Sequence, residues 1–151
     1  MQNVIDETTA KFGRIDVLIN NAQASASGVT LADHTTEQFD LALYSGLYAA
    51  FYYMKACYPH LKETKGSVIN FASGAYGQCA YAAAKEGIRG LTRVAANEWG
   101  PDGINANIIC PLAWTAQLEN FQQAYPEAFE ANVKMPPAGH YGDVEKEIGR
   151  A

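Results

Sequence analysis

Three short apolar runs divide the chain and predict β-strands, at residues 15–21, 66–72 and 104–110. Each run has the length of a strand and is rich in β-branched residues, and Pro111 stops the third. Because the runs are apolar throughout rather than alternating with polar residues, they predict strands buried on both faces of a parallel sheet.

The stretches between and beside these runs predict helices. Thr35 or Thr36 can cap a long helix over residues 36–62, and an alanine-rich helix over 81–99 ends at Gly100-Pro101. Further helices are predicted at residues 2–12, on both sides of Pro126, and at the end of the C-terminal tail.

This alternation of helices and strands predicts βαβ units, and therefore an α/β fold with a parallel sheet in one domain over residues 1–151. Ligands of such folds bind beyond the carboxyl ends of the strands. Those ends are Asn20–Ala22, Ala72–Ser73 and Cys110–Leu112. We therefore expect the chemistry to lie at this edge of the sheet.

Composition narrows the classes of function. The 151 residues include 16 acidic and 11 basic ones, for a net charge of −5, which argues against a nucleic acid or an anionic membrane as partner. The chain has no apolar run long enough to span a bilayer, and its N-terminus does not resemble a signal peptide, so we expect a cytoplasmic protein. Neither a metal site nor a disulfide framework is expected from the cysteines, Cys57, Cys79 and Cys110.

Tyr81 and Lys85 are the residues whose spacing points to catalysis. They are four positions apart, so they share one face of the predicted helix. A tyrosine with an ordinary pKa of about 10 is a poor base at neutral pH, and a nearby ammonium group favours its phenolate. The pair could therefore transfer protons, although an exposed helix pair remains an alternative. Ser73, eight residues before Tyr81, is either part of this site or simply the end of a strand.

Four segments resemble the short-chain dehydrogenase/reductase family. FGRIDVLINNA is similar to the family's fourth strand with its NNAG motif, and GSVINFAS to the fifth strand with its serine. YAAAK fits the YxxxK motif, and GINANIICPLAWT resembles the sixth strand with its Pro-Gly motif. The resemblance implies a Rossmann-like, doubly wound sheet, of which this chain lacks the N-terminal strands and the last strand.

The resemblance also implies roles for individual residues in an NAD- or NADP-dependent oxidoreductase that interconverts an alcohol and a carbonyl. Tyr81 would donate or accept the proton, Lys85 would assist it and bind the nicotinamide ribose, and Ser73 would orient the substrate oxygen. The remaining implied cofactor contacts are Asn20, Asn21 and Ala22 near the adenosine half, and Pro111, Leu112 and Thr115 near the nicotinamide. The cofactor could be either NAD or NADP, and the substrate a small molecule.

Several positions depart from the family pattern. The glycine-rich turn TGxxxGxG is not in the chain, NNAG reads NNAQ with Gln23, and Pro-Gly reads Pro111-Leu112. Gly46 stands where the family often has an asparagine. Either the sequence is part of a longer chain, which we favour, or it is a truncated relative that acts as a non-catalytic oligomeric scaffold. A flavodoxin-like binding domain would explain the alternation but not YxxxK.

The aromatic run YSGLYAAFYYMKACY carries more apolar surface than one face of a sheet can bury. In the family the corresponding helices pack against a partner subunit, so we expect a homodimer or homotetramer through helices 36–62 and 81–99. Only helix 2–12 and the C-terminal helix are expected to cover the opposite face of the sheet. A partly apolar substrate pocket is expected within residues 74–80 and 112–140, from Trp114, Phe121, Tyr125 and Met135.

Overall fold

The computed structural model describes residues 2–26, 28–73, 79–132 and 139–143. The chain divides into two compact units, Met1–Cys110 and Pro111–Ala151. None of the helices in the described part of the chain is both long and apolar enough to cross a bilayer.

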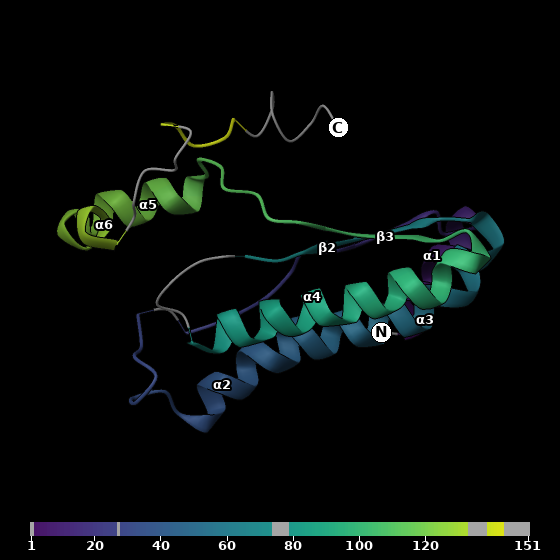
Figure 1. Ribbon diagram of the computed structural model, residues 1–151, viewed down its shortest axis with the longest axis horizontal. Helices are drawn as coiled ribbons and strands as arrows, with labels where there is room; N and C mark the ends of the chain where they lie inside the picture. The colour runs from purple at the N-terminus through teal and green to yellow at the C-terminus, as the bar shows by residue number, and fades with distance from the viewer. Residues whose placement is uncertain (1, 27, 74–78, 133–138, 144–151) are drawn as a thin grey trace. The chain divides into compact units, whose positions relative to one another are not determined.

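The first unit is built on a three-stranded parallel sheet, as the sequence predicts (Figure 1). Its strands are β1 (Val17–Asn20), β2 (Ser67–Phe71) and β3 (Asn105–Ile109), in the order β1-β2-β3. Leu18 pairs with Val68, which pairs with Ala106, so these three side chains share one face. Each strand is shorter than its apolar run, because the ends of the runs turn into the connecting loops.

The predicted helix 36–62 is one helical rod with a change of winding in its middle. Helix α2 (Thr36–Ala42) begins at a capping box, in which the Thr35 side chain accepts from the backbone of Gln38 and the Gln38 side chain accepts from the backbone of Thr35. A π-helical stretch, η1 (Leu43–Tyr48), follows, and α3 (Ala49–Thr64) completes the rod. A π-helix inserts an extra residue into a helix, so the apolar positions before and after it do not form one stripe.

The predicted helix 81–99 forms as α4 (Cys79–Trp99), which continues into the short 3₁₀ helix η2 (Gly100–Asp102). Gly103 follows with a φ of 84°, a left-handed conformation that favours glycine and lets the chain turn into β3. Helix α1 (Gln2–Phe12) precedes the sheet.

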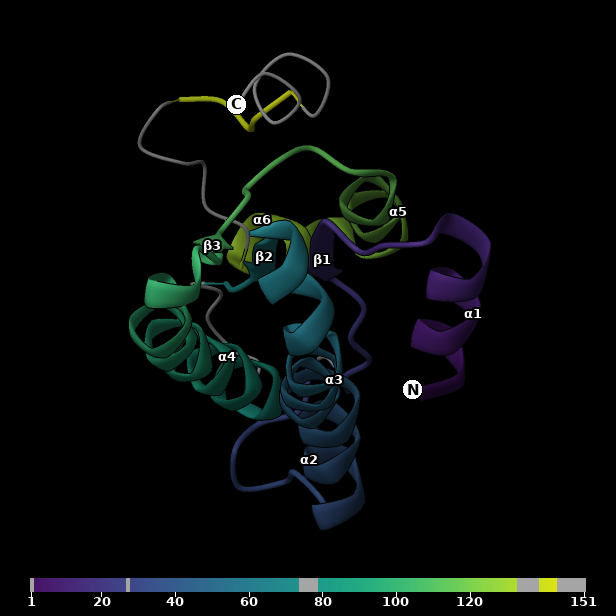
Figure 2. The ribbon, with the colours of Figure 1, turned by 90° about the vertical axis from the view of Figure 1, so that its right-hand side faces the viewer.

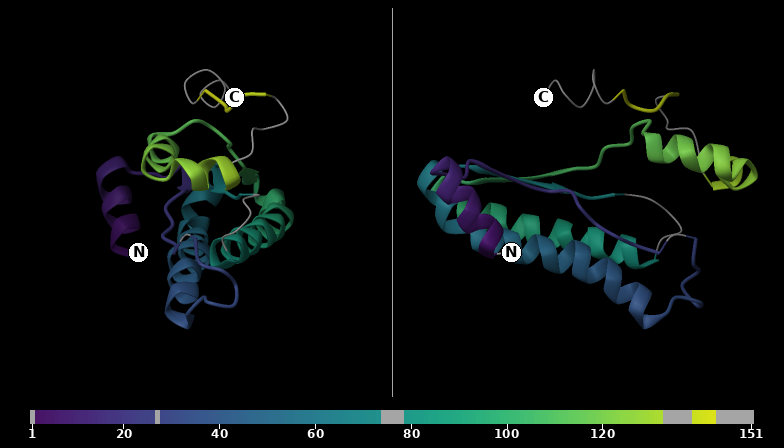
Figure 3. Two further views of the ribbon diagram at one scale, coloured as in Figure 1. Left: turned by 90° about the vertical axis from the view of Figure 1, so that its left-hand side faces the viewer. Right: turned by 180° about the vertical axis from the view of Figure 1, so that it is seen from behind.

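Helices α3 and α4 cover one face of the sheet, and the core of the first unit lies between them and the strands (Figure 2). Val68 and Leu61 are fully buried there, with Met54 and Ile104 beside them. The expectation that residues 2–12 cover the opposite face is wrong. Ile5, the one buried residue of α1, belongs to this same core, so α1 lies beside α3 (Figure 3).

The opposite face of the sheet carries the alternate side chains of each strand. Val17 is 50% exposed and Ile19 is 59% exposed, and Ile69, in register with Ile19, is half-buried. Within the first unit, the described helices lie on the other side, which is why these apolar side chains remain accessible.

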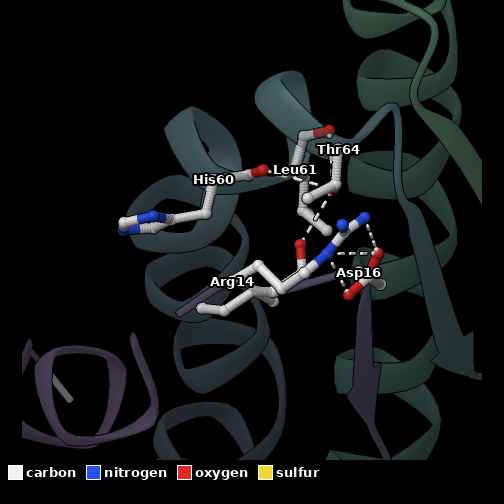
Figure 4. Close-up of polar contacts among 6 residues, drawn as sticks. Arg14, Asp16, His60, Leu61 and Thr64 are labelled. Carbon is white, nitrogen blue, oxygen red and sulfur yellow. Dashed lines mark hydrogen bonds and ion pairs between the residues drawn. The ribbon is translucent and has the colours of Figure 1, made fainter. Parts of the chain in front are cut away.

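The end of α3 is hydrogen-bonded to the segment that leads into β1, at the amino end of the sheet (Figure 4). The Thr64 hydroxyl lies 2.9 Å from the carbonyl of Ile15, to which it donates. The backbone N–H of Ser67 donates to the carbonyl of Asp16 at 2.9 Å, and Arg14 forms an ion pair with the Asp16 carboxylate. The two hydrogen bonds join the end of α3 and the start of β2 to the chain before β1, whereas the ion pair lies within that segment.

The second unit contains two short helices, on either side of Pro126 as predicted. These are α5 (Ala116–Ala124) and α6 (Pro126–Asn132). Proline suits the first position of a helix because it has no N–H to leave unpaired there. Trp114 packs edge-on against Phe129 and Tyr141, and a parallel bridge joins Ala113 to Gly142. The helix predicted at the end of the tail lies outside the described residues.

Candidate active site

The carboxyl ends of the parallel strands bring the predicted residues of the first unit to one edge of the sheet. Asn20 is the last residue of β1, Phe71 is the last of β2, and Ser73 follows two positions later. Helix α4, which begins at this edge, carries Tyr81 and Lys85 in its first two turns. The sequence therefore predicts correctly which elements converge here.

Lys85 is buried under this edge, with only 3% of its surface exposed. Its Nζ donates to the carbonyl of Phe71 at 2.9 Å and lies 5.3 Å from the centre of the Tyr81 ring. Burial lowers the pKa of Lys85, and the nearby Cys110 opposes this effect in part. The amine therefore exchanges its proton more readily near neutral pH than an exposed lysine does. Spacing alone predicts the pairing with Tyr81 but not this burial.

A buried chain of polar side chains connects β1, β2 and α4 beneath the site. Asn20 donates through Nδ2 to Oδ1 of Asn70 at 2.8 Å, and Asn70 donates through its own Nδ2 to the Thr92 hydroxyl at 2.8 Å. The Thr92 hydroxyl donates in turn to the carbonyl of Ile88. Asn70 is fully buried, and a buried amide requires such partners. The Asn20 side chain thus has a structural role, because it joins the end of β1 to the neighbouring strand β2.

The sequence gives no sign of the Asn70–Thr92 contact. Both are ordinary polar residues within apolar segments, and their partners come from other elements of the fold. Polar residues at core positions of a predicted strand and a predicted helix are the one signal that could have pointed to them.

Ser73 is half-buried just beyond β2. Residues 74–78, which connect it to α4, lie outside the described part of the chain. Tyr81 is itself half-buried in the first turn of α4. The predicted alignment of Ser73 with Tyr81 therefore stays a prediction, and so does the contribution of residues 74–80 to a substrate pocket.

The segment after β1 leaves Asn21 and Ala22 exposed at the edge of the sheet. Gln23, the next residue, turns its side chain onto η1. A Cβ added to Gly46 would lie 2.6 Å from Cδ of Gln23, so the carboxamide fills the space above this glycine. The sequence marks both residues as departures from the family pattern, but it does not show that they are in contact.

Arg89 and Cys110 form a second polar contact at this edge. The Arg89 guanidinium lies 3.6 Å from the Cys110 sulfur and also forms an ion pair with Glu86. Hydrogen bonds to Cys110 and Glu86 raise the pKa of Arg89. Some of the donors of the Arg89 guanidinium are therefore already used by Cys110 and Glu86. Arg93 is exposed.

Three predicted cofactor contacts, Pro111, Leu112 and Thr115, lie in the second unit. The Leu112 carbonyl accepts from the backbone of Gly142, and its side chain is 60% exposed. The Thr115 hydroxyl caps α5 by accepting from the backbone N–H of Leu118 at 3.3 Å. Thr115 thus has a structural role of its own, and its contact with a cofactor stays a prediction.

Three of the predicted pocket residues, Trp114, Phe121 and Tyr125, belong to an aromatic cluster of the second unit. Phe121 packs against Phe129, which contacts Trp114 edge-on, and Tyr125 stacks at an angle on Phe121. Met135 lies outside the described residues. Across the ranges that the structure describes, no group of three or more His, Cys, Asp or Glu side chains could hold a metal ion.

Comparisons with known proteins identify the family of this chain. A family model described as enoyl-(acyl carrier protein) reductase matches residues 1–151. A 12α-hydroxysteroid dehydrogenase from a Clostridium species is 64% identical over 155 residues, which covers 99% of this chain and 60% of that protein. The chain thus spans about three fifths of the length of this curated relative.

Two solved structures share the fold. A putative short-chain dehydrogenase/reductase from Burkholderia xenovorans superimposes with a TM-score of 0.83 at 25% identity, over 94% of this chain and 58% of that one. The structure of ElxO with NADP bound gives a TM-score of 0.83 at 26% identity, over 93% of this chain and 60% of that one. The family and the α/β fold predicted from the sequence are both confirmed.

Proposed function

The chain belongs to the short-chain dehydrogenase/reductase family, and we propose that the protein carrying it is an NAD(P)-dependent oxidoreductase that interconverts an alcohol and a carbonyl. The observation that carries this proposal is the environment of Lys85. Its buried amine is fixed to the end of β2 and lies beside the Tyr81 ring, at the edge where ligands of parallel sheets bind.

In this proposal Tyr81 donates a proton to the substrate oxygen during reduction and accepts it during oxidation. Lys85 stays close to Tyr81 because its Nζ is bound to the Phe71 carbonyl, and its lowered pKa lets it pass protons onward. Ser73 orients the substrate oxygen from the end of β2. The nicotinamide supplies or takes up the hydride when it is bound.

The residues of the first unit fit the nicotinamide and ribose part of such a cofactor. The ammonium group of Lys85 has three N–H donors. One of them donates to the Phe71 carbonyl, and the others could donate to ribose hydroxyls. Asn21 and Ala22 are exposed at the same edge and would lie along the adenosine half. The sequence has no glycine-rich turn to hold the pyrophosphate, and the choice between NAD and NADP stays open.

The substrate that we propose to test first is a steroid alcohol, because the 64% identical relative is named a 12α-hydroxysteroid dehydrogenase. We also propose that the protein is cytoplasmic.

The test is the substitution Tyr81→Phe, assayed by nicotinamide absorbance with a hydroxysteroid. Loss of the proton donor should lower kcat by about 10²–10⁴-fold while cofactor binding persists. Tyr53→Phe is the matched control, because Tyr53 lies on α3, packs against the core and belongs to neither the proposed site nor the proposed interface, so it should keep full activity. Undiminished turnover by Tyr81→Phe would refute the role of Tyr81. Failure of the unmodified protein to bind either cofactor would favour the scaffold alternative.

We also propose that the protein is an oligomer through the helical rod and α4. Four aromatic side chains on the rod are 41–61% exposed and stack on one another: Tyr44, Tyr48, Phe51 and Tyr52. A groove of about 270 Å³ between α3 and α4 is lined by Phe51, Leu91 and Val94, among others. An isologous partner would cover this apolar surface. A monomer in sedimentation at micromolar concentration would contradict this proposal.

A further inference from the structure

The contact between Gln23 and Gly46 joins two segments that are far apart in the sequence. A Cβ on Gly46 would lie 2.6 Å from Cδ, 2.8 Å from Nε2 and 2.9 Å from Oε1 of Gln23. Real side chains do not approach this closely, so a side chain at position 46 would displace the flexible end of Gln23 from its present position. Gly46 is buried, in the π-helical stretch η1.

Hydrogen bonds attach the same segment to the rod. Nε2 of Gln23 donates to the carbonyl of Ala42, immediately before η1, at 3.4 Å. The backbone N–H of Ala24 donates to the Ser45 hydroxyl at 3.0 Å, and that hydroxyl also donates to the carbonyl of Leu41 at 2.6 Å. The chain after β1 is therefore held on η1 by side chains from both segments.

The contact continues from η1 to α4, which carries the catalytic candidates. A Cβ on Gly87 would lie 2.7 Å from Cδ2 of Leu47, so α4 and η1 approach closely one residue after Gly46 and two residues after Lys85. Gln23 thus packs on η1, and η1 packs in turn on α4, the helix that carries Lys85.

Oε1 of Gln23 is buried and has no hydrogen-bond partner among the described residues. A buried acceptor without a hydrogen-bond partner destabilises the fold, so the Gln23 carboxamide lowers the stability of this site. An apolar side chain of similar length would fill the same space without that cost. This favours a role for the carboxamide beyond filling space.

We propose that Gln23 is a positioning residue: its carboxamide, bound to the Ala42 carbonyl and packed on Gly46, holds the preceding residues Asn21 and Ala22 in place at the carboxyl end of β1. This inference rests on the proposed function, because Asn21 and Ala22 are the residues proposed to lie along the cofactor. Its effect is on cofactor binding rather than on the proton transfer by Tyr81.

The test combines unfolding and binding measurements on Gln23→Ala, Gly46→Ala and the double variant. Gly46→Ala alone should lower the unfolding midpoint, since the new methyl group displaces the carboxamide and breaks its hydrogen bond to the Ala42 carbonyl. The double variant should unfold at a higher temperature than Gly46→Ala, because the first substitution removes the obstacle to the second. Gly90→Ala is the matched control: this glycine is exposed on α4 with nothing within 4 Å of an added Cβ. It should not be destabilised, since alanine favours a helix.

Cofactor binding separates positioning from stability. Gln23→Ala should raise the cofactor Kd and KM by roughly tenfold, with kcat at saturating cofactor nearly unchanged, as expected for one lost interaction in a bound state. The double variant should regain stability but keep the raised Kd. The proposal is overturned if the double variant is no more stable than Gly46→Ala, or if Gln23→Ala binds cofactor as tightly as the unmodified protein.

The two proposals can fail separately. If the unmodified protein binds neither cofactor, the proposed function fails, and the role of Gln23 in cofactor binding fails with it. The unfolding midpoints still show in that case whether positions 23 and 46 are in contact. If the unmodified protein binds cofactor and Gln23→Ala does so equally well, only the role of Gln23 is refuted.

Discussion

Removing the Thr92 hydroxyl tests the buried polar chain under the site. Thr92→Val preserves the shape of the side chain but deletes the acceptor that Nδ2 of Asn70 uses at 2.8 Å. Asn70 is fully buried, so water cannot replace the lost partner. The thioether of Met54, a weak acceptor, remains 3.4 Å away.

The expected cost is set by that geometry. Leaving a buried amide N–H with a weak partner costs about 1–3 kcal/mol in the free energy of unfolding. The carbonyl of Ile88, to which the hydroxyl donates, stays within the backbone hydrogen bonding of α4, so its loss adds little. In a chain of this size, each kcal/mol lowers the unfolding midpoint by about 2–4 °C.

The assay is urea unfolding followed by far-ultraviolet circular dichroism, with Thr8→Val as the matched control. The Thr8 hydroxyl also donates to the carbonyl four residues earlier, at 2.6 Å, but on the exposed side of α1. Thr8→Val should change the free energy of unfolding by no more than about 0.5 kcal/mol. If Thr92→Val lies within that same range, the Asn70 amide does not depend on Thr92 and the reasoning is wrong.

Two further substitutions test contacts away from the site. Hydrogen bonds from Lys62 and then Tyr58 lower the pKa of Asp102. The carboxylate therefore stabilises the fold above its unfolded pKa of about 3.9, and this contribution is lost as the pH falls through the lower folded value. Asp102→Asn should be less stable than the unmodified protein at pH 7 and match it in acid, as measured by thermal unfolding; an equal difference at both pH values would contradict this. Gly66→Ala should be severely destabilising by circular dichroism, because its Cβ would collide with a backbone carbonyl, whereas Gly100→Ala meets nothing within 4 Å. Equal stability of these two variants would contradict the packing described at the start of β2.

The sequence predicts the elements that carry strong local signals. The strands are apolar runs of strand length, and the helices have a cap at Thr35 or an end at Gly100-Pro101, so both are found with small errors at their boundaries. The convergence of Tyr81 and Lys85 on the strand ends follows from the parallel order alone. Family resemblance adds their roles, which remain predictions to be tested.

Features that depend on contacts between distant segments could not be predicted. The expected placement of α1 is wrong because one buried residue, Ile5, decides it, and the core that Ile5 joins includes Met54, Cys57 and Leu61 of α3. The π-helical stretch has no pattern of its own, since its extra residue only shifts the periodicity of the helix after it. Gln23 and Gly46 are each recognisable as departures from the family pattern, but their contact appears only when the loop meets the helix.

The all-parallel order of the sheet has a consequence for how the chain folds. Asn20 and Asn70 are 50 positions apart, so β1 and β2 cannot pair as a hairpin. The connecting segment must lose conformational entropy before the strand pairing stabilises the sheet. Helices form from local contacts within about a microsecond, whereas such distant pairing is slow. We therefore expect refolding to gain helix first and the sheet later, with the Tyr81–Lys85 pair present on its helix before the edge that it serves has been assembled.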